Sequence, residues 1–151
     1  MRREIVLAHE FVEFIPDEIE ERTLYVSMKF GTVVHKCCCG CKQEVVTPLG
    51  PTDWKLIFDG KAISLDPSIG NWGFACQSHY WIRNSRVRWS AWWSPEEIAA
   101  GRAHDRAAKD GYFNAVNEGT NGVEKDSAGA VERARKKRRF WHKVRDWWRR
   151  S

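Results

Sequence analysis

Short runs of β-forming residues, separated by turn residues, occupy the first 93 positions of the chain. Residues 11–15 and 23–27 cluster or alternate apolar side chains around an acidic connection, which is typical of two early strands. Turn signals such as Asp59-Gly60 separate the later runs. Those later runs are also predicted to be strands: 44–47, 54–58, 61–65, 80–83 and 86–89. The pattern predicts a small, mainly β body built of hairpins or ribbons.

The pattern changes beyond Trp93. Ser94 is a suitable N-cap and Pro95 a suitable first helical residue, so a helix is predicted from about residue 95 to about 109, ending before Gly111. The next stretch has little periodicity and is interpreted as a linker, after which a second helix is predicted. The fold class is therefore α+β, mainly β with C-terminal helices. The predicted segments are 1–93, 94–113, 114–129 and 130–151.

The last predicted helix is basic and amphipathic. Its aromatic residues recur at helical spacing, which places an apolar stripe on a cationic helix. Three uses fit this pattern: docking onto the body or a protein partner, binding nucleic acid, or lying on an anionic membrane surface. The candidate residues for polyanion or partner binding are Arg135, Lys136, Lys137, Arg138, Arg139, Trp141, Trp147 and Trp148.

Charge separates this tail from the body. The net charge of the 151 residues is +5, but residues 129–151 hold ten Lys and Arg against two acidic residues. The tail thus carries +8 and residues 1–128 carry −3, so polyanion binding would concern the tail alone. No apolar run approaches the roughly 20 residues of a membrane span, and the N-terminus lacks the apolar core of a signal peptide. We therefore expect a cytoplasmic protein.

All five cysteines lie in two short segments. Cys37-Cys38-Cys39-Gly40-Cys41 forms the first, and Cys76-Gln77-Ser78-His79 forms the second. Sulfur and imidazole are preferred ligands of zinc and of iron–sulfur centres, so the two segments predict a metal site. The spacing does not choose among the five cysteines and His79. Gly40 suits a tight ligand loop because glycine accepts positive φ.

Several alternatives remain open at this stage. The favoured cofactor is structural Zn, and the main rival is a [2Fe–2S] cluster held by the same Cys and His ligands. Catalytic zinc is disfavoured, because the chain has no H-E-x-x-H motif. A spare cysteine beside the metal would be a candidate nucleophile. The plainest alternative is that the cysteines are small buried residues and His79 a hydrogen-bonded core histidine.

Four stretches of the chain, within about residues 23–89, together resemble a bacterial family called domain of unknown function 6527. They are LYVS at 24–27, CCCGC with the following VVTPL at 37–49, SLDPSIGNW at 64–72 and CQSHYWI at 76–82. The resemblance implies a small metal-binding protein, some of whose relatives are encoded near bacterial ubiquitin-like conjugation genes. It also implies a ligand role for Cys37, Cys39, Cys41, Cys76 and His79. The chain departs from the family pattern at Lys42, where that pattern has glycine.

The sequence by itself names no reaction and no catalytic residue. We expect a non-catalytic, zinc-stabilised accessory protein with a protein partner, in a ubiquitin-like modification or defence pathway. The alternatives are an iron–sulfur redox protein and a nucleic-acid binder acting through the tail, with membrane binding less favoured. A possible partner surface consists of Trp54, Asn71, Trp72 and Trp81, although tryptophans also serve to fill a core or cover a metal.

Overall fold

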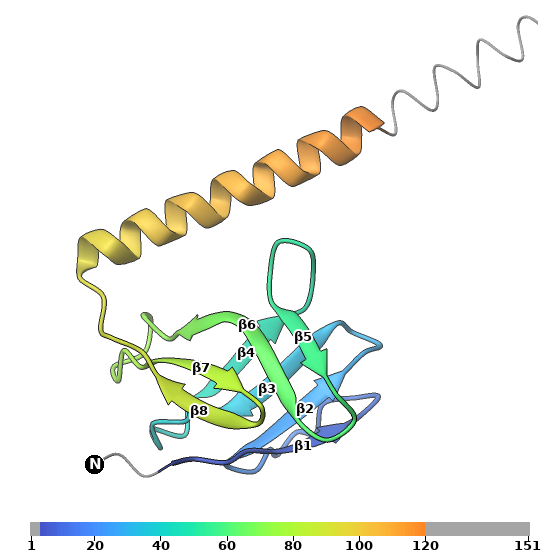
Figure 1. The fold of residues 1–151 in the computed structure, drawn as a ribbon, viewed down its shortest axis with the longest axis vertical. Coiled ribbons are helices and arrows are strands. Elements are labelled where there is room, and N and C mark those ends of the chain that lie inside the picture. The colour runs from blue at the N-terminus through green and yellow to red at the C-terminus, as the bar shows by residue number, and fades with distance from the viewer. Residues whose placement is uncertain (1–3, 120–151) are drawn as a thin grey trace, which may run out of the picture. The chain divides into compact units, whose positions relative to one another are not determined.

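The computed structural model describes residues 4–119, which contain eight strands and one helix (Figure 1). The chain divides into two compact units, Met1–Asp105 and Arg106–Ser151. The first unit contains every strand, so the predicted mainly β body is confirmed. The strands are β1 (Ala8–Phe11), β2 (Thr23–Ser27), β3 (Thr32–Lys36), β4 (Glu44–Pro48), β5 (Lys55–Phe58), β6 (Ile63–Gly70), β7 (His79–Arg83) and β8 (Arg86–Trp89).

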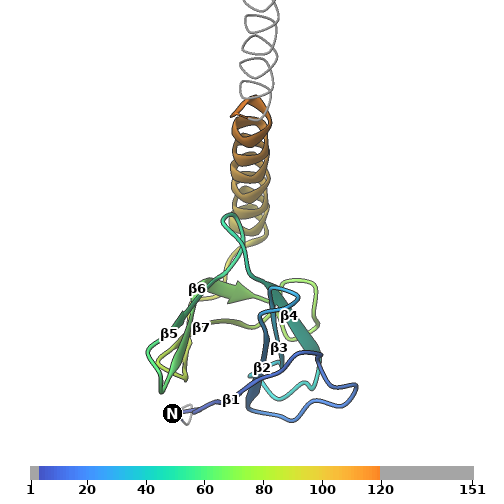
Figure 2. The same ribbon diagram turned by 90° about the vertical axis from the view of Figure 1, so that its right-hand side faces the viewer.

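The strands form two four-stranded sheets that face each other (Figure 2). The first sheet has the order β1-β2-β3-β4, with β1 parallel to β2 and the other pairs antiparallel. The second sheet has the order β5-β6-β7-β8 and is antiparallel throughout. Its first turn is a tight hairpin, in which Asp59 Oδ1 accepts the N–H groups of Lys61 and Ala62 and Gly60 has a φ of 92°.

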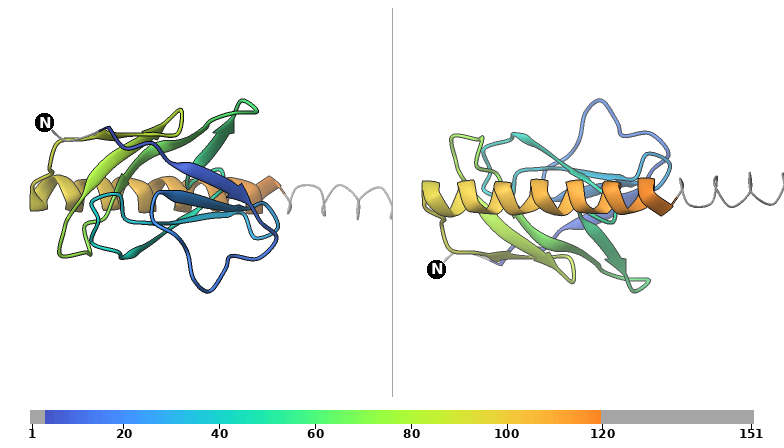
Figure 3. Two further views of the ribbon diagram at one scale, coloured as in Figure 1. Left: turned by 90° about the horizontal axis from the view of Figure 1, so that it is seen from below. Right: turned by 90° about the horizontal axis from the view of Figure 1, so that it is seen from above.

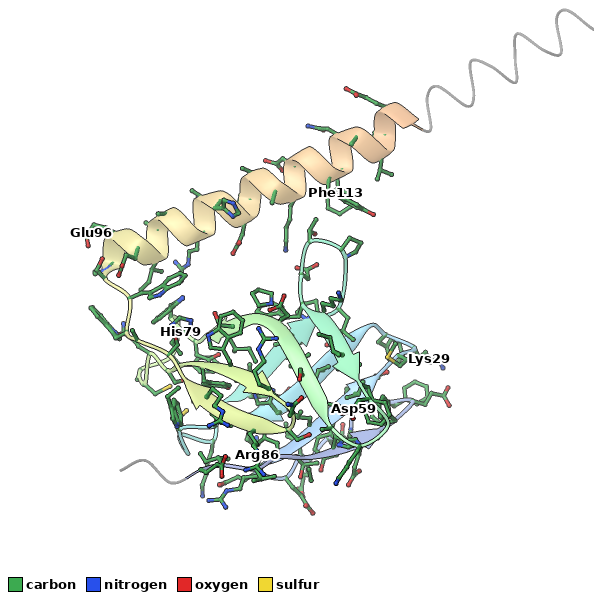
Figure 4. All side chains as sticks on the ribbon, viewed as in Figure 1. Lys29, Asp59, His79, Arg86, Glu96 and Phe113 are labelled. Atoms are coloured by element: carbon green, nitrogen blue, oxygen red, sulfur yellow. The ribbon has the colours of Figure 1, made fainter. Side chains whose placement is uncertain are left out.

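The N-terminal segment joins the two sheets. Leu7 N–H donates to Ser85 and Val87 N–H donates to Ile5, which places this segment beside β8 (Figure 3). Arg86 of β8 forms an ion pair with Glu4 of the same segment at 2.7 Å (Figure 4). Because the chain continues from this segment directly into β1, a single stretch of backbone borders both sheets.

The core lies between the two sheets. Alternation along β7 turns Tyr80 and Ile82 inward, and both are fully buried. They pack with Leu24 and Val26 of the first sheet and with Leu65 of β6. His79 and Trp81 lie on the opposite face of β7. The imidazole of His79 is therefore on the side of the strand that faces away from the core.

Several predicted boundaries differ from the structure. The first strand is Ala8–Phe11 rather than the predicted 11–15, because residues 8–11 are the ones that pair with β2, in parallel. Residues 32–36, which had no predicted strand, form β3, and β6 continues to Gly70. A bulge between Leu65 and Ile69 allows that extension, and it breaks the regular alternation that the sequence pattern depends on.

The helix covers residues 95–119. Its predicted start is correct: Ser94 N–H donates to Glu97, and Glu97 N–H donates back to the Ser94 hydroxyl, a reciprocal capping box. The expected end at Gly111 and the expected linker from 114 are corrected as far as residue 119, because one helical glycine costs only about 1 kcal/mol. No helix among residues 4–119 has the length and apolar composition to span a membrane. The predicted basic helix lies outside the described residues.

Candidate metal centre and Ser–His pair

Four of the predicted ligands converge. The Sγ atoms of Cys37, Cys39, Cys41 and Cys76 all lie within 4.8 Å of one another. The first three lie on the connection between β3 and β4, and Cys76 lies on the connection between β6 and β7. The fold therefore brings together two segments that are 35 residues apart at their nearest ligands. This arrangement makes the cluster a possible metal site.

The sulfur geometry fits a tetrahedral ion. Cys37 Sγ lies 3.4 Å from Cys39 Sγ and 3.9 Å from Cys76 Sγ, and Cys41 Sγ lies 3.7 Å from Cys76 Sγ. Four thiolates at the usual Zn–S distance of about 2.3 Å would be separated by about 3.8 Å. Without a cation, burial raises the pKa of Cys37 and of Cys39. A bound cation would lower the pKa of these thiols and so stabilise the thiolate form, which burial alone destabilises.

The ligand loop needs two left-handed residues. Gly40 has a φ of 90°, and its N–H donates to the Cys37 carbonyl at 3.1 Å. Lys42 has a φ of 63°, at the position where the resembled family has glycine. Lysine accepts this conformation at a cost of roughly 1–2 kcal/mol, so the departure from the pattern leaves the loop shape intact.

A buried polar network lies behind the sulfurs. The Asn71 amide donates to Ser78 Oγ at 2.9 Å and to Cys37 Sγ at 3.6 Å. Ser78 Oγ lies 3.1 Å from Cys37 Sγ and 3.5 Å from Cys76 Sγ. Such outer contacts orient metal ligands and are part of a metal site's design. The same amide reaches Tyr80 Oη at 3.4 Å, which ties the cluster to the core.

The structure does not bring His79 into the sulfur cluster. His79 is 6% exposed, and its Nε2 lies 2.9 Å from Ser68 Oγ while its Nδ1 lies 2.8 Å from the Ala91 carbonyl oxygen (Figure 4). Both ring nitrogens are thus engaged away from the sulfurs. The reason is that β7 begins at His79, and strand alternation turns its side chain to the outer face while Cys76 remains in the preceding turn.

The tautomer of neutral His79 follows from these partners. A carbonyl oxygen only accepts hydrogen bonds, so Nδ1 must carry the proton that reaches Ala91. Nε2 is then unprotonated and accepts the hydroxyl proton of Ser68. A serine hydroxyl that donates to an oriented imidazole is the arrangement of an activated nucleophile and its base.

Two tryptophans enclose the His79 ring. The ring centroids of Trp72 and Trp93 each lie 5.0 Å from that of His79, and the two indoles stack at 5.6 Å with an interplanar angle of 19°. Gly70 makes room for Trp72: a Cβ at Gly70 would lie 2.3 Å from the indole Nε1. Three residues of the run from Ser68 to Trp72 therefore shape the surroundings of His79: Ser68 binds it, Trp72 packs against it, and Gly70 leaves room for Trp72.

The remaining cysteine, Cys38, lies outside the cluster of four sulfurs. Cys38 is partly buried, and burial raises the pKa of its thiol to about 12. A thiol with that pKa is protonated at neutral pH and reacts slowly. Burial thus disfavours the thiolate of Cys38, and the alternative of a reactive spare cysteine stays a prediction.

The residues of the predicted partner surface differ in burial. Asn71 is 8% exposed and belongs to the buried network. Trp72 covers His79, and Trp54 is half-buried at the end of the loop between β4 and β5. Trp81 lies beneath the guanidinium of Arg83, at 4.6 Å. A partner surface at these residues stays a prediction. The tail candidates Arg135–Arg139, Trp141, Trp147 and Trp148 lie outside the described residues.

Most of the β body matches a known protein family. Residues 11–90 match the family model described as bacterial ubiquitination-like system serine protease (BubE). The chain belongs to this family. Comparisons with curated proteins and with solved structures gave no match. The family confirms the predicted link to bacterial ubiquitin-like systems, while the likeness to domain of unknown function 6527 stays a prediction.

The family description names a serine protease, whereas the sequence had suggested a non-catalytic role. From the sequence no serine was named as a candidate, because no local motif marks Ser68. Ser68 and His79 come from different strands, and serine in a strand has no periodic signature. The usable signal was the run from Ser68 to Trp72, where Gly70 and Trp72 are placed beside a histidine-containing strand.

Proposed function

We propose that this protein is a serine protease in which Ser68 is the nucleophile and His79 the general base. The observation that carries this proposal is the 2.9 Å contact between Ser68 Oγ and His79 Nε2, with Nδ1 held by Ala91. The family description supports the reaction class. The base is oriented by a backbone carbonyl, in the place that a carboxylate occupies in a Ser-His-Asp triad.

The mechanism follows from these contacts. His79 Nε2 takes the hydroxyl proton as Ser68 Oγ bonds to the carbonyl carbon of the scissile peptide bond. His79 then gives this proton to the leaving amine as the carbon–nitrogen bond breaks, which leaves an ester on Ser68. A water molecule, deprotonated by the same nitrogen, attacks the ester and releases the acid and the free Ser68 hydroxyl. The Ala91 carbonyl stabilises the imidazolium formed in each half-reaction.

We propose zinc as the ion of the four-cysteine cluster, in a structural role. Four thiolates in a tetrahedral array make a closed site with no open position for water or substrate. A reducing compartment such as the bacterial cytoplasm keeps these thiols available. Colour separates zinc from the [2Fe–2S] alternative, because an iron–sulfur protein absorbs visible light and a zinc protein does not.

A short segment of chain connects the cysteine cluster to the two proposed catalytic residues. Cys76 lies three residues and Ser78 one residue before His79, and Asn71 lies three residues after Ser68. The amide of Asn71 binds Ser78, so both catalytic residues are attached to the sulfur cluster through one network. The substrate we propose is a peptide or isopeptide bond of a protein in a bacterial ubiquitination-like system, which makes a protein the expected partner.

The test is labelling by an alkyl fluorophosphonate, which phosphonylates activated serines. We expect stoichiometric labelling at Ser68, located by peptide mass spectrometry, and its loss in Ser68→Ala. His79→Ala should slow labelling by about 10²–10⁴-fold. Ser90→Ala and His104→Ala are matched controls that should label normally, since neither lies in the pair. Labelling of Ser68→Ala at the rate of the unmodified protein would refute the assignment.

A further inference from the structure

The edge of β6 beside Ser68 has no strand partner. On one side, β6 pairs with β7 through Leu65, Ile69 and Gly70. On the other side, β5 pairs only with residues from Ile63 to Asp66. β6 continues to Gly70, so its last four residues extend beyond the end of β5. Within residues 4–119, the edge from Pro67 to Gly70 is therefore left open on the β5 side.

The backbone groups along this edge point outward. Asn71 N–H donates to the Ser78 carbonyl, and Ile69 is paired with Tyr80, so these two residues face β7. His79, opposite Gly70, uses its carbonyl to accept the Ser90 N–H on the β8 side. Alternation then turns the N–H and C=O groups of Gly70 toward the open side, and Ser68 precedes this residue by two positions, within the bulge of the same strand. The nucleophile thus lies on a strand edge that can pair with another chain.

A cavity borders the same edge. Its volume is about 620 Å³, and it lies between the β2–β3 turn, the loop between β4 and β5, and the bulge of β6. Pro67, the residue before Ser68, is part of its wall. The apolar side chains in that wall are Met28, Leu49, Pro51, Trp54, Leu56 and Pro67. A second cavity of about 470 Å³ lies beside the cysteine cluster, but Ser68 and its neighbours on β6 take no part in it.

We infer that the substrate binds as an added β-strand on the open edge of β6 and places an apolar side chain in the cavity bounded by Met28, Trp54 and Pro67. The occupant is an extended polypeptide segment, because a strand edge offers alternating donors and acceptors that match a peptide backbone. Pro67 in the cavity wall is the residue before Ser68, and a strand sends alternate side chains to opposite faces, so a segment paired along this edge can place a side chain in the cavity within a few residues of the scissile bond. This inference rests on the proposed role of Ser68.

The probes are tripeptidyl diphenyl phosphonates, which label a catalytic serine at a rate that reports peptide recognition. An all-alanine probe is compared with probes carrying leucine at each position in turn. We expect leucine at one position to raise the second-order rate constant by about tenfold or more. Met28→Glu should remove this gain, because Met28 is 64% exposed on the cavity wall and is distant from the core. Val46→Glu, a change at a side chain of β4 that is 54% exposed, should retain it.

N-methylation of the probe tests backbone pairing without changing the protein. We expect methylation of an amide that faces β6 to slow labelling by about fivefold or more, and methylation of the next amide to have little effect. Equal labelling rates for all N-methyl probes would overturn the inference. So would a rate increase from leucine that persists in Met28→Glu. In either case, labelling by the alkyl fluorophosphonate would still support Ser68 as the nucleophile. Absence of labelling by both classes of probe would overturn the proposed function and this inference with it.

Discussion

Replacement of Gly70 by alanine tests whether Trp72 positions the catalytic pair. The added Cβ would lie 2.3 Å from Trp72 Nε1 and 2.6 Å from Cε2, where real contacts need about 3.4 Å or more. The indole must therefore move by about 1 Å, since the backbone of β6 is fixed by its pairing with β7. Trp72 contacts both His79 and Trp93, so the movement reaches the ring of the general base.

Two magnitudes follow from this geometry. Weakening two aromatic pairs costs about 1–3 kcal/mol of folding free energy, which a folded domain survives. Misplacing a catalytic group by about 1 Å slows the reaction by about 10²-fold. We therefore expect Gly70→Ala to remain folded, with a modestly lower melting temperature and a labelling rate near one hundredth of that of the unmodified protein.

The assay combines fluorophosphonate labelling with thermal unfolding and metal analysis. Gly73→Ala is the matched control, because a Cβ at Gly73 meets no atom within 4 Å. It should leave the labelling rate unchanged. If Gly70→Ala reacted as fast as Gly73→Ala, Trp72 would have no role in placing His79, and our account of the run from Ser68 to Trp72 would be incorrect.

Three further changes probe the metal centre and the core. Cys76→Ser should lose most of the bound zinc and unfold the body, because the binding of structural zinc contributes about 10–16 kcal/mol to the free energy of folding. Cys38→Ser should keep the zinc. Mass spectrometry of the metal content per chain distinguishes the two variants. Asn71→Ala should cost about 1–3 kcal/mol in chemical denaturation, since Ser78 and Tyr80 lose a buried donor. Burial lowers the pKa of His35 to about 4, so the unfolded chain binds more protons between pH 6.5 and 4 and stability falls across that range, by up to about 3 kcal/mol. His35→Gln should flatten this slope in denaturation at matched metal content; an unchanged slope would mean that another group is responsible.

The strands were largely predictable because their signals are local. The residues of β2 and β8 alternate or cluster β-formers between turn signals, and both strands have their predicted bounds. The parallel pairing of β1 with β2 was not predictable, because it depends on residues that only the folded chain brings together. The same is true of the bulge that extends β6 beyond Leu65, through Ser68, to Gly70.

The candidate site also has a part that the sequence predicts and a part that it does not. Clustered cysteines are rare in sequence, so four of the predicted ligands could be recognised before the fold was known. The spacing of Cys76 and His79 also suggested a shared ion, but spacing says nothing of side-chain direction. The start of β7 at His79 decides that direction, and it pairs the imidazole with a serine that the sequence does not distinguish from the others.

The two ends of β6 should differ in their tolerance of inserted residues. At one end, the turn of Asp59 and Gly60 is exposed and makes only local hydrogen bonds, so a short flexible insert there should leave the sheet intact. At the other end, residues 71–78 carry Asn71, Trp72, Cys76 and Ser78 in one short connection. An insert there would separate the sulfur cluster from the nucleophile, so a reporter peptide or an affinity tag within this chain belongs at Gly60.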